Sequence, residues 1–452
     1  MTTLTPRLTL ASLTALFLVG GLPVSPAGAE VESFPPIKDA GRTAIFAPTG
    51  IEADEVKKAK VKLLRRHGAK KRRLRTHKVR DALTNSTTVT VSKRRRRDEA
   101  ERLIVKLARP APTTGCEFGA FSGLNLPGPC WRPYSDRSPF NRELPANVRQ
   151  APRSAEMAQR VGNYGGGAQI VAGVADSGSD YEHPLFYSQP GDPTYTIHCI
   201  EYSGRCEIEG MQVRIPVEAR PAGGADHHLA VIDQASGWEY DLYNVQGKPS
   251  GEGGQLTIGW GGRTEIGTPD ATGLDSNATA AHFGLAAGVI RPAELETGEI
   301  DHALVISVKC TNGTSVRPAG TGTGRPCTQL GLPNAGAPPM GSHFYLDMTE
   351  AEIAAADVTE WERTIMTAMA RYGAFIEDTG ADYNGWAIKV ESGTSYTAFG
   401  QPDPWVELGK KYNLPNFHRN GIGQLYVFDL QDTVDWKREF AVADPCVSAG
   451  TC

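Results

Sequence analysis

The sequence lacks any long apolar run after its N-terminus, and this limits how the protein can meet a membrane. Its longest apolar stretch lies between Leu8 and Leu22, follows Arg7, and precedes the small residues Ala27-Gly28-Ala29. This pattern is typical of a signal peptide over residues 1–29, and the run is shorter than the roughly 20 apolar residues of a membrane-spanning helix. We therefore predict a protein without a membrane span that is secreted, either extracellular or associated with the cell wall.

Two common kinds of site are also missing. No Cys-x-x-Cys pair or Cys/His cluster has zinc-finger spacing, and no Gly-x-Ser-x-Gly nucleophile elbow is present. The 8 cysteines instead form pairs that are close in sequence, as expected of disulfides in an oxidising compartment. The four predicted disulfides are Cys116–Cys130, Cys199–Cys206, Cys310–Cys327 and Cys446–Cys452. We predict no metal or cofactor in the site, with a structural Ca²⁺ as an open alternative.

Aromatic residues are scarce in residues 30–110, where Lys and Arg are crowded, for example from Lys93 to Arg97. Low apolar content with blocks of like charge predicts a disordered propeptide or a tether to anionic cell-wall polymer. The same lack of interleaved aromatics disfavours nucleic acid as a partner. The net charge of −4 conceals this basic segment, because the rest of the chain is acidic.

Residues 111–452 contain short β-rich runs separated by Gly, Pro and other turn residues. This composition predicts a mainly β domain, an antiparallel β-sandwich of the jelly-roll kind. Thr349 with Glu352 and Thr359 with Glu362 have capping-box spacing, which predicts a helical appendage near residues 349–373. The expected strands are 168–174, 195–200, 211–215, 255–260, 300–309, 343–347, 374–376, 386–390 and 424–430.

The stretch from Asp226 to Tyr243 is the densest set of titratable groups on expected regular structure. Two alternating runs flank a Gln-Ala-Ser-Gly turn, which predicts a β-hairpin. Side chains two apart share a face, so Asp226 lies with His228, and Glu239 lies with Asp241 and Tyr243. The alternative for Glu239 and Asp241 is a pair of solvated carboxylates on an open sheet face.

The Glu239-x-Asp241 pair resembles the Glu-x-Asp-x-x-Glu motif of laminarinase-like glycoside hydrolases, which carry it on a β-sandwich strand. Asn244 stands where that family has its acid/base Glu. The resemblance implies carboxylate-based cleavage of a polysaccharide. The run from Cys116 to the end also resembles secreted bacterial proteins of unassigned function, and that likeness implies domain limits but no reaction.

Three functions remain open at this point. The first is a glycoside hydrolase of an extracellular polysaccharide, in which Glu239 and Asp241 are the catalytic carboxylates with Asp226 as an acid/base partner. The second is a polysaccharide lyase, in which His228 and Tyr243 abstract a proton and Arg214 or Arg263 binds the uronate. The third is a non-catalytic glycan-binding protein of the cell wall. For the favoured hydrolase, substrate binding is assigned to Tyr243, Trp260 and Arg263.

Overall fold

The computed structural model describes most of the chain after residue 130. The described residues are 131–452 without 165–167, 202, 248–252, 277, 321–323, 381–385 and 420–421, together with 118, 121, 126, 127 and the backbone of short strands between residues 31 and 107. The expected signal peptide and the expected Cys116–Cys130 disulfide lie outside these residues. None of the helices in this described part is long and apolar enough to cross a membrane.

The basic segment for which the sequence predicts disorder contains strands in two antiparallel sheets, ordered β1-β7-β4-β5 and β2-β3-β6. In β4, lysines from Lys58 to Lys62 alternate with Ala59 and Val61, which is the period of a strand. Composition alone does not reveal this alternation, because it counts the charged residues without their positions. The strands are β1 (Val31–Phe34), β2 (Lys38–Asp39), β3 (Thr43–Phe46), β4 (Val56–Leu64), β5 (Arg75–Lys78), β6 (Val89–Ser92) and β7 (Glu99–Leu107).

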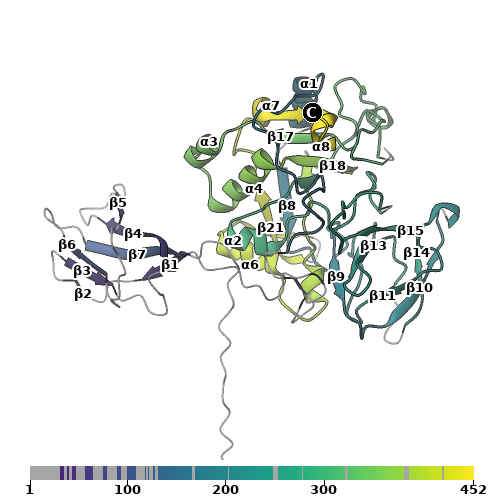
Figure 1. Cartoon of the computed structure of the whole chain (residues 1–452), viewed down its shortest axis with the longest axis horizontal. Helices are drawn as coiled ribbons and strands as arrows, with labels where there is room; N and C mark the ends of the chain where they lie inside the picture. The colour runs from purple at the N-terminus through teal and green to yellow at the C-terminus, as the bar shows by residue number, and fades with distance from the viewer. Residues whose placement is uncertain are drawn as a thin grey trace, which may run out of the picture.

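A mixed eight-stranded sheet organises the rest of the chain, in the order β20-β21-β8-β19-β16-β18-β17-β22 (Figure 1). Its β8/β19 and β16/β18 pairs are parallel and the others are antiparallel. The β16/β18 pairing shifts register because Glu377 is an extra residue between the partners of Ile306 and Ser307. The strands are β8 (Ala168–Ala172), β16 (Leu304–Val308), β17 (His343–Leu346), β18 (Ala374–Thr379), β19 (Trp386–Ile388), β20 (Asn416–Arg419), β21 (Ile422–Asp429) and β22 (Phe440–Ala443).

Helices pack on this sheet and share its large apolar core. The predicted appendage is confirmed as α3 and α4, and both begin with the expected capping boxes at Thr349 and Thr359. Trp361, Ile365 and Met369 bury one stripe of α4 at helical spacing. The helices are α1 (Ser154–Gly162), α2 (Pro292–Thr297), α3 (Glu350–Ala355), α4 (Glu360–Arg371), α5 (Thr394–Thr397), α6 (Pro404–Lys411), α7 (Trp436–Glu439) and α8 (Pro445–Ala449).

Two smaller sheets share a second apolar core, which includes Ile197, Leu229 and Leu256. One is ordered β15-β13-β12-β9 and the other β11-β10-β14, and both contain a parallel pair. In Figure 1 they form the teal side of the molecule. Their strands are β9 (Leu185–Ser188), β10 (Thr194–Cys199), β11 (Gln212–Arg214), β12 (Leu229–Asp233), β13 (Trp238–Tyr243), β14 (Gly254–Ile258) and β15 (Trp260–Glu265).

The chain is therefore sheet-rich, as predicted, but its described residues form several mixed sheets and none of them closes. A single antiparallel jelly-roll sandwich over residues 111–452 is not confirmed. Parallel strands are joined by a long crossover connection, and the length and composition of a single strand do not show whether its partner is parallel or antiparallel. Three of the predicted disulfides are present in the described part, namely Cys199–Cys206, Cys310–Cys327 and Cys446–Cys452.

Candidate functional site

The expected hairpin is confirmed as β12 and β13, which pair antiparallel from Leu229↔Leu242 to Asp233↔Trp238. Asp241 lies opposite Ala230, and Glu239 lies opposite Ile232. Directly opposed residues share a face, and Ala230 and Ile232 belong to the large core. Both carboxyl groups are therefore buried and 0% exposed, and they do not form the solvated pair of an open sheet face.

Each of the two buried carboxyl groups has specific hydrogen-bond donors. The Tyr134 hydroxyl donates to Glu239 Oε2 over 2.6 Å, and the Ala286 amide donates to Glu239 Oε1 over 2.8 Å. The Ser276 hydroxyl donates to Asp241 Oδ2. Residues 276 and 278–286, which carry Ser276 and Ala286, form the covering segment of this pair. A Cβ atom on Gly284 would lie 2.3 Å from the Tyr134 hydroxyl, so the covering segment packs tightly against the pair.

Burial raises the pKa of Glu239, and burial together with the nearby Glu239 charge raises the pKa of Asp241 well above its usual range. Burial and mutual repulsion both favour the protonated form, so two carboxyl groups that share a dry site do not ionise together readily. We call Glu239 and Asp241 the buried carboxyl pair. In this conformation, neither side chain contacts solvent.

The open end of the same hairpin brings together further titratable groups, of which Asp226 and Tyr243 are half-buried and His228 is buried. Asp226, His228 and Tyr243 meet there, with the His228 and Tyr243 rings 5.9 Å apart and the Asp226 charge acting on His228. Side chains from three other segments join them through ring contacts and charge interactions. We call the whole group the Lys389 cluster, and it consists of Glu182, His183, Asp226, His228, Tyr243, Glu377, Asp378 and Lys389.

The side chains of the Lys389 cluster come from several elements of the fold. Glu377 is the extra residue of the β16/β18 bulge, and bulges commonly redirect a side chain beside a functional site. Lys389 follows β19 directly, and His183 precedes β9 and forms an isolated bridge with Glu391. The cluster therefore lies where the large sheet adjoins the four-stranded sheet.

The inner part of the cluster is buried. His183 Nε2 lies 3.3 Å from Glu377 Oε1, and the Nδ1 atom of the same ring lies 2.9 Å from the Leu285 carbonyl oxygen. The His183 and His228 rings are 5.3 Å apart and perpendicular. Asp226, Tyr243, Asp378 and Lys389 are only half-buried, so the cluster reaches solvent on one side.

Burial and mutual charge shift the protonation of these groups. Burial raises the pKa of Glu377 to about 8 against the opposing charge of Lys389. Burial and the charge of Asp226 raise the pKa of Asp378 to about 6, although the Thr379 amide and Lys389 oppose this rise. Burial lowers the pKa of His228 to about 4, which leaves its imidazole neutral at physiological pH. Such divergent pKa values are the property that separates acids from bases in catalytic sites.

Two further features mark this region. His228 Nδ1 and Glu377 Oε2 are buried without a hydrogen-bond partner among the described residues. Four non-glycine residues around the open end have positive φ: His227 (40°), Asn244 (52°), Asp275 (65°) and His282 (63°). Unsatisfied buried polar atoms and strained backbone concentrate at functional sites.

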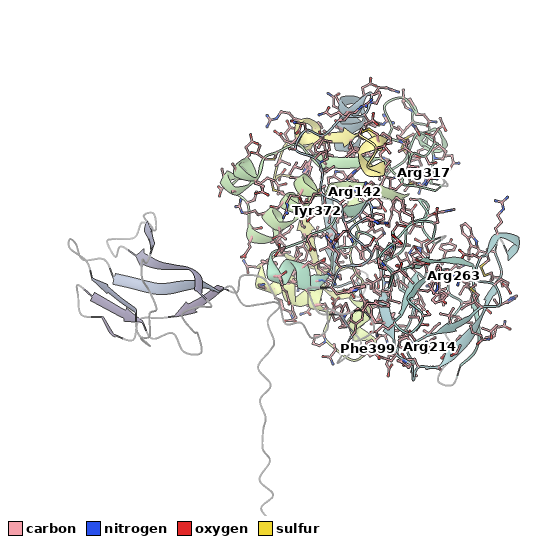
Figure 2. All side chains as sticks on the ribbon, in the orientation of Figure 1. Arg142, Arg214, Arg263, Arg317, Tyr372 and Phe399 are labelled. Atoms are coloured by element: carbon pink, nitrogen blue, oxygen red, sulfur yellow. A yellow bond between two sulfur atoms is a disulfide. The ribbon has the colours of Figure 1, made fainter. Side chains whose placement is uncertain are left out.

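The other predicted site residues lie differently. Arg263 pairs with Tyr240 in register, so it lies on the face opposite the buried carboxyl pair, where its guanidinium stacks over Trp238 at 4.1 Å. Arg214 bonds Asp233 through Nη1 at 2.9 Å, and Figure 2 labels both arginines on the small sheets. Trp260 begins β15, and its ring lies 5.7 Å from that of His282. The structure thus joins Asp226, His228 and Tyr243, but it brings neither arginine to them.

Sequence reasoning missed Glu377, Asp378, Lys389 and His183. Glu377 and Asp378 form an acidic pair directly after the apolar run 374–376. Two acids at the end of a buried strand are the sequence feature that could have indicated a site there. His302 is buried, with Nε2 3.1 Å from Glu294 Oε1. No group of three His, Cys, Asp or Glu side chains within the described ranges could hold a metal ion.

The chain was compared with protein-family models, with curated proteins and with solved structures, and none of these comparisons found a match. The function must therefore be argued from the site.

Proposed function

We propose that the protein is a carbohydrate-active enzyme that hydrolyses glycosidic bonds of an extracellular polysaccharide. The observation that carries this proposal is the relation between two half-buried carboxyl groups, Asp226 and Asp378. Asp226 precedes β12 and Asp378 lies on β18, and burial together with the charge of Asp226 raises the pKa of Asp378. Glycoside hydrolysis requires two carboxyl groups of which one is protonated, and the raised pKa of Asp378 suits it to that role.

The roles follow from protonation. Asp378, with its pKa of about 6, is the general acid that gives a proton to the glycosidic oxygen as the C–O bond breaks. Asp226 is the carboxylate that takes a proton from the water that adds to the anomeric carbon. The Thr379 amide donates to Asp378 Oδ1 over 2.6 Å and fixes the acid, while neutral His228 borders Asp226.

The charge of the cluster favours a neutral polysaccharide. Lys389 is surrounded by the carboxyl groups of Glu182, Glu377, Asp378 and Asp226, which together raise its pKa although burial opposes this. The lysine charge is thereby balanced by the protein itself, and a uronate would meet a surplus of carboxyl groups. The buried carboxyl pair serves as fixed support beneath the site rather than as the reacting pair.

A lyase is the second candidate, and one contact favours it. The rings of His228 and Tyr243 lie 5.9 Å apart, and a neutral imidazole beside a phenol is a plausible base and acid for proton abstraction. Without Arg214 or Arg263 in the cluster, Lys389 would have to bind the uronate carboxylate. The three disulfides fit an extracellular site of action for either reaction.

A panel of neutral and uronic-acid polysaccharides tests the proposal. We expect new reducing ends without ultraviolet-absorbing products, with activity that falls as pH rises through about 6 because Asp378 loses its proton. Asp378→Asn and Asp226→Asn should each lower kcat at least about 100-fold, since each removes a titrating group and keeps its shape. The control Asp270→Asn, at an exposed pair with Arg137, should keep the wild-type rate.

Three results would contradict the proposal. An unsaturated, absorbing product would establish a lyase, and binding without any product would establish a glycan-binding protein. Wild-type rates in both carboxyl variants would place the reaction away from the Lys389 cluster.

A further inference from the structure

A cavity of about 290 Å³ lies among α1, β17, β22 and α8, and none of its lining residues belongs to the hairpin. Its walls are mostly apolar, with Met157, Val316 and Val442 among them. Two buried residues with reactive side chains, His343 and Ser448, also line it. The proposed glycosidase site uses neither of them.

The hydrogen bonds of His343 determine which ring nitrogen acts as an acceptor. Nε2 lies 2.7 Å from the carbonyl oxygen of Tyr372, which can only accept, so Nε2 carries the proton. In the neutral ring, Nδ1 is then unprotonated and can accept a hydrogen bond, and it lies 3.0 Å from the Ser448 hydroxyl oxygen. Ser448 therefore donates its proton toward His343, which is the arrangement of a nucleophile and its general base.

Both partners are held in place. The His343 ring stacks on Phe375 with centroids 3.9 Å apart, and the backbone at Gly373 leaves no room for the ring to move, since a Cβ there would lie 2.3 Å from Nε2. Ser448 lies on α8, which the Cys446–Cys452 disulfide and the Asp444 cap on the Cys446 amide both anchor. The Arg142 guanidinium donates to the Ser448 carbonyl oxygen over 3.1 Å. Such fixed orientation is what a catalytic pair requires.

We propose that Ser448 and His343 form a second catalytic site, which hydrolyses esters of short, apolar carboxylic acids. Ser448 Oγ attacks the ester carbonyl carbon while its proton passes to His343 Nδ1. The proton then passes to the leaving alcohol oxygen as the C–O bond breaks, and an acyl-serine remains. Water, deprotonated by the same nitrogen, attacks the acyl group, and the proton returns to Ser448 as the acid leaves.

The cavity sets the class of substrate. A volume near 290 Å³ lies at the lower limit for small-molecule pockets, so the walls accept a short acyl chain and exclude a long one. The exposed Arg317 also lines the cavity and provides a positive charge for the polar end of the substrate (Figure 2). Burial lowers the pKa of His343 to about 4, so the base is neutral under ordinary conditions. The site is independent of the proposed glycosidase reaction.

Reaction with a fluorophosphonate, followed by peptide mass mapping of the wild-type protein, tests the proposal without any variant. We expect a covalent adduct on Ser448. We also expect hydrolysis of p-nitrophenyl butyrate that declines as pH falls through about 4, when His343 becomes protonated. Ser448→Ala should lose both the adduct and at least about 100-fold of the hydrolysis rate.

Ser138→Ala is the matched control, because Ser138 is also buried but lies outside the lining of this cavity and donates to the Thr272 carbonyl oxygen instead of a histidine. It should keep the adduct and a rate within about twofold of wild type. An adduct on any residue other than Ser448, no adduct at all, or an unchanged rate in Ser448→Ala would overturn the proposal. In those cases Ser448 only satisfies a buried histidine.

Discussion

Replacing Glu377 by Gln gives the sharpest test of the electrostatics of the Lys389 cluster. Glu377 is 1% exposed, and burial raises its pKa from the ordinary value of 4.5 to about 8. The folded protein therefore holds a proton at this position between pH 4.5 and pH 8, while the unfolded chain releases it. Gln is a neutral isostere of the protonated acid, so the variant mimics the folded state of Glu377 at every pH in this range.

The sign of the effect follows from proton linkage. A raised folded pKa contributes stability that is present below pH 4.5 and is lost as pH rises toward about 8. One proton changes the free energy of unfolding by about 1.4 kcal/mol per pH unit. Between pH 5 and pH 7, wild type should therefore lose roughly 2 to 3 kcal/mol relative to Glu377→Gln.

Urea unfolding of both proteins at several pH values measures this difference. Other buried acids, such as Asp180 and Glu391, also have raised pKa values of about 7, but their contribution is common to both proteins and cancels. The exposed Glu299→Gln is a control whose stability should follow wild type across the range. Parallel curves for wild type and Glu377→Gln, within about 0.5 kcal/mol, would refute the reasoning, because Glu377 would then titrate as an ordinary surface acid.

Two glycine substitutions test the packing around each proposed site. Gly284→Ala should destabilise the fold by roughly 2 kcal/mol or more, because its Cβ would lie 2.3 Å from the Tyr134 hydroxyl and 3.0 Å from Glu239 Oε1. The control Gly191→Ala has no atom within 4 Å of its Cβ, so it should stay within about 0.5 kcal/mol of wild type in the same denaturation assay. Gly373→Ala should cost more than Gly400→Ala in thermal unfolding, because both have positive φ (78° and 72°) but only the first would meet His343. Equal losses of stability within either pair of variants would show that the close approach at Gly284 or Gly373 does not affect the free energy of unfolding.

Local patterns predicted much of the secondary structure. Alternation over Thr194–Cys199 matches strand β10, the apolar run Leu304–Val308 matches strand β16, and the capping box at Thr359 matches the start of α4. The signals are local because a strand repeats every two residues and a helix cap spans four. The pairing of distant strands leaves no such signal, so the mixed sheets were not predicted.

The burial of the carboxyl pair shows why the candidate site was only partly predicted. The segment Leu229–Ile232 is continuously apolar, which is typical of a strand buried on both faces. That pattern argued against an open face for Glu239 and Asp241, but the donors that make their burial tolerable lie on Tyr134 and Ser276, which are distant in sequence. The acids of β18 were equally hidden, because only the bulge at Glu377 directs them toward the hairpin.

The end of the covering segment divides one face of the hairpin into two parts. Ser276 donates to Asp241 and the Ala286 amide donates to Glu239, so residues 276 and 278–286 cover the middle of the face and exclude water from it. Beyond this cover, Tyr243 and Asp226 are half-buried. The same alternation in sequence therefore produces a buried carboxyl pair in the middle of the face and half-buried acids at its open end, which would exchange protons with a substrate under the proposed function. Under the proposed function, the chemistry on this hairpin belongs to its open end, whereas the covered pair faces the large core.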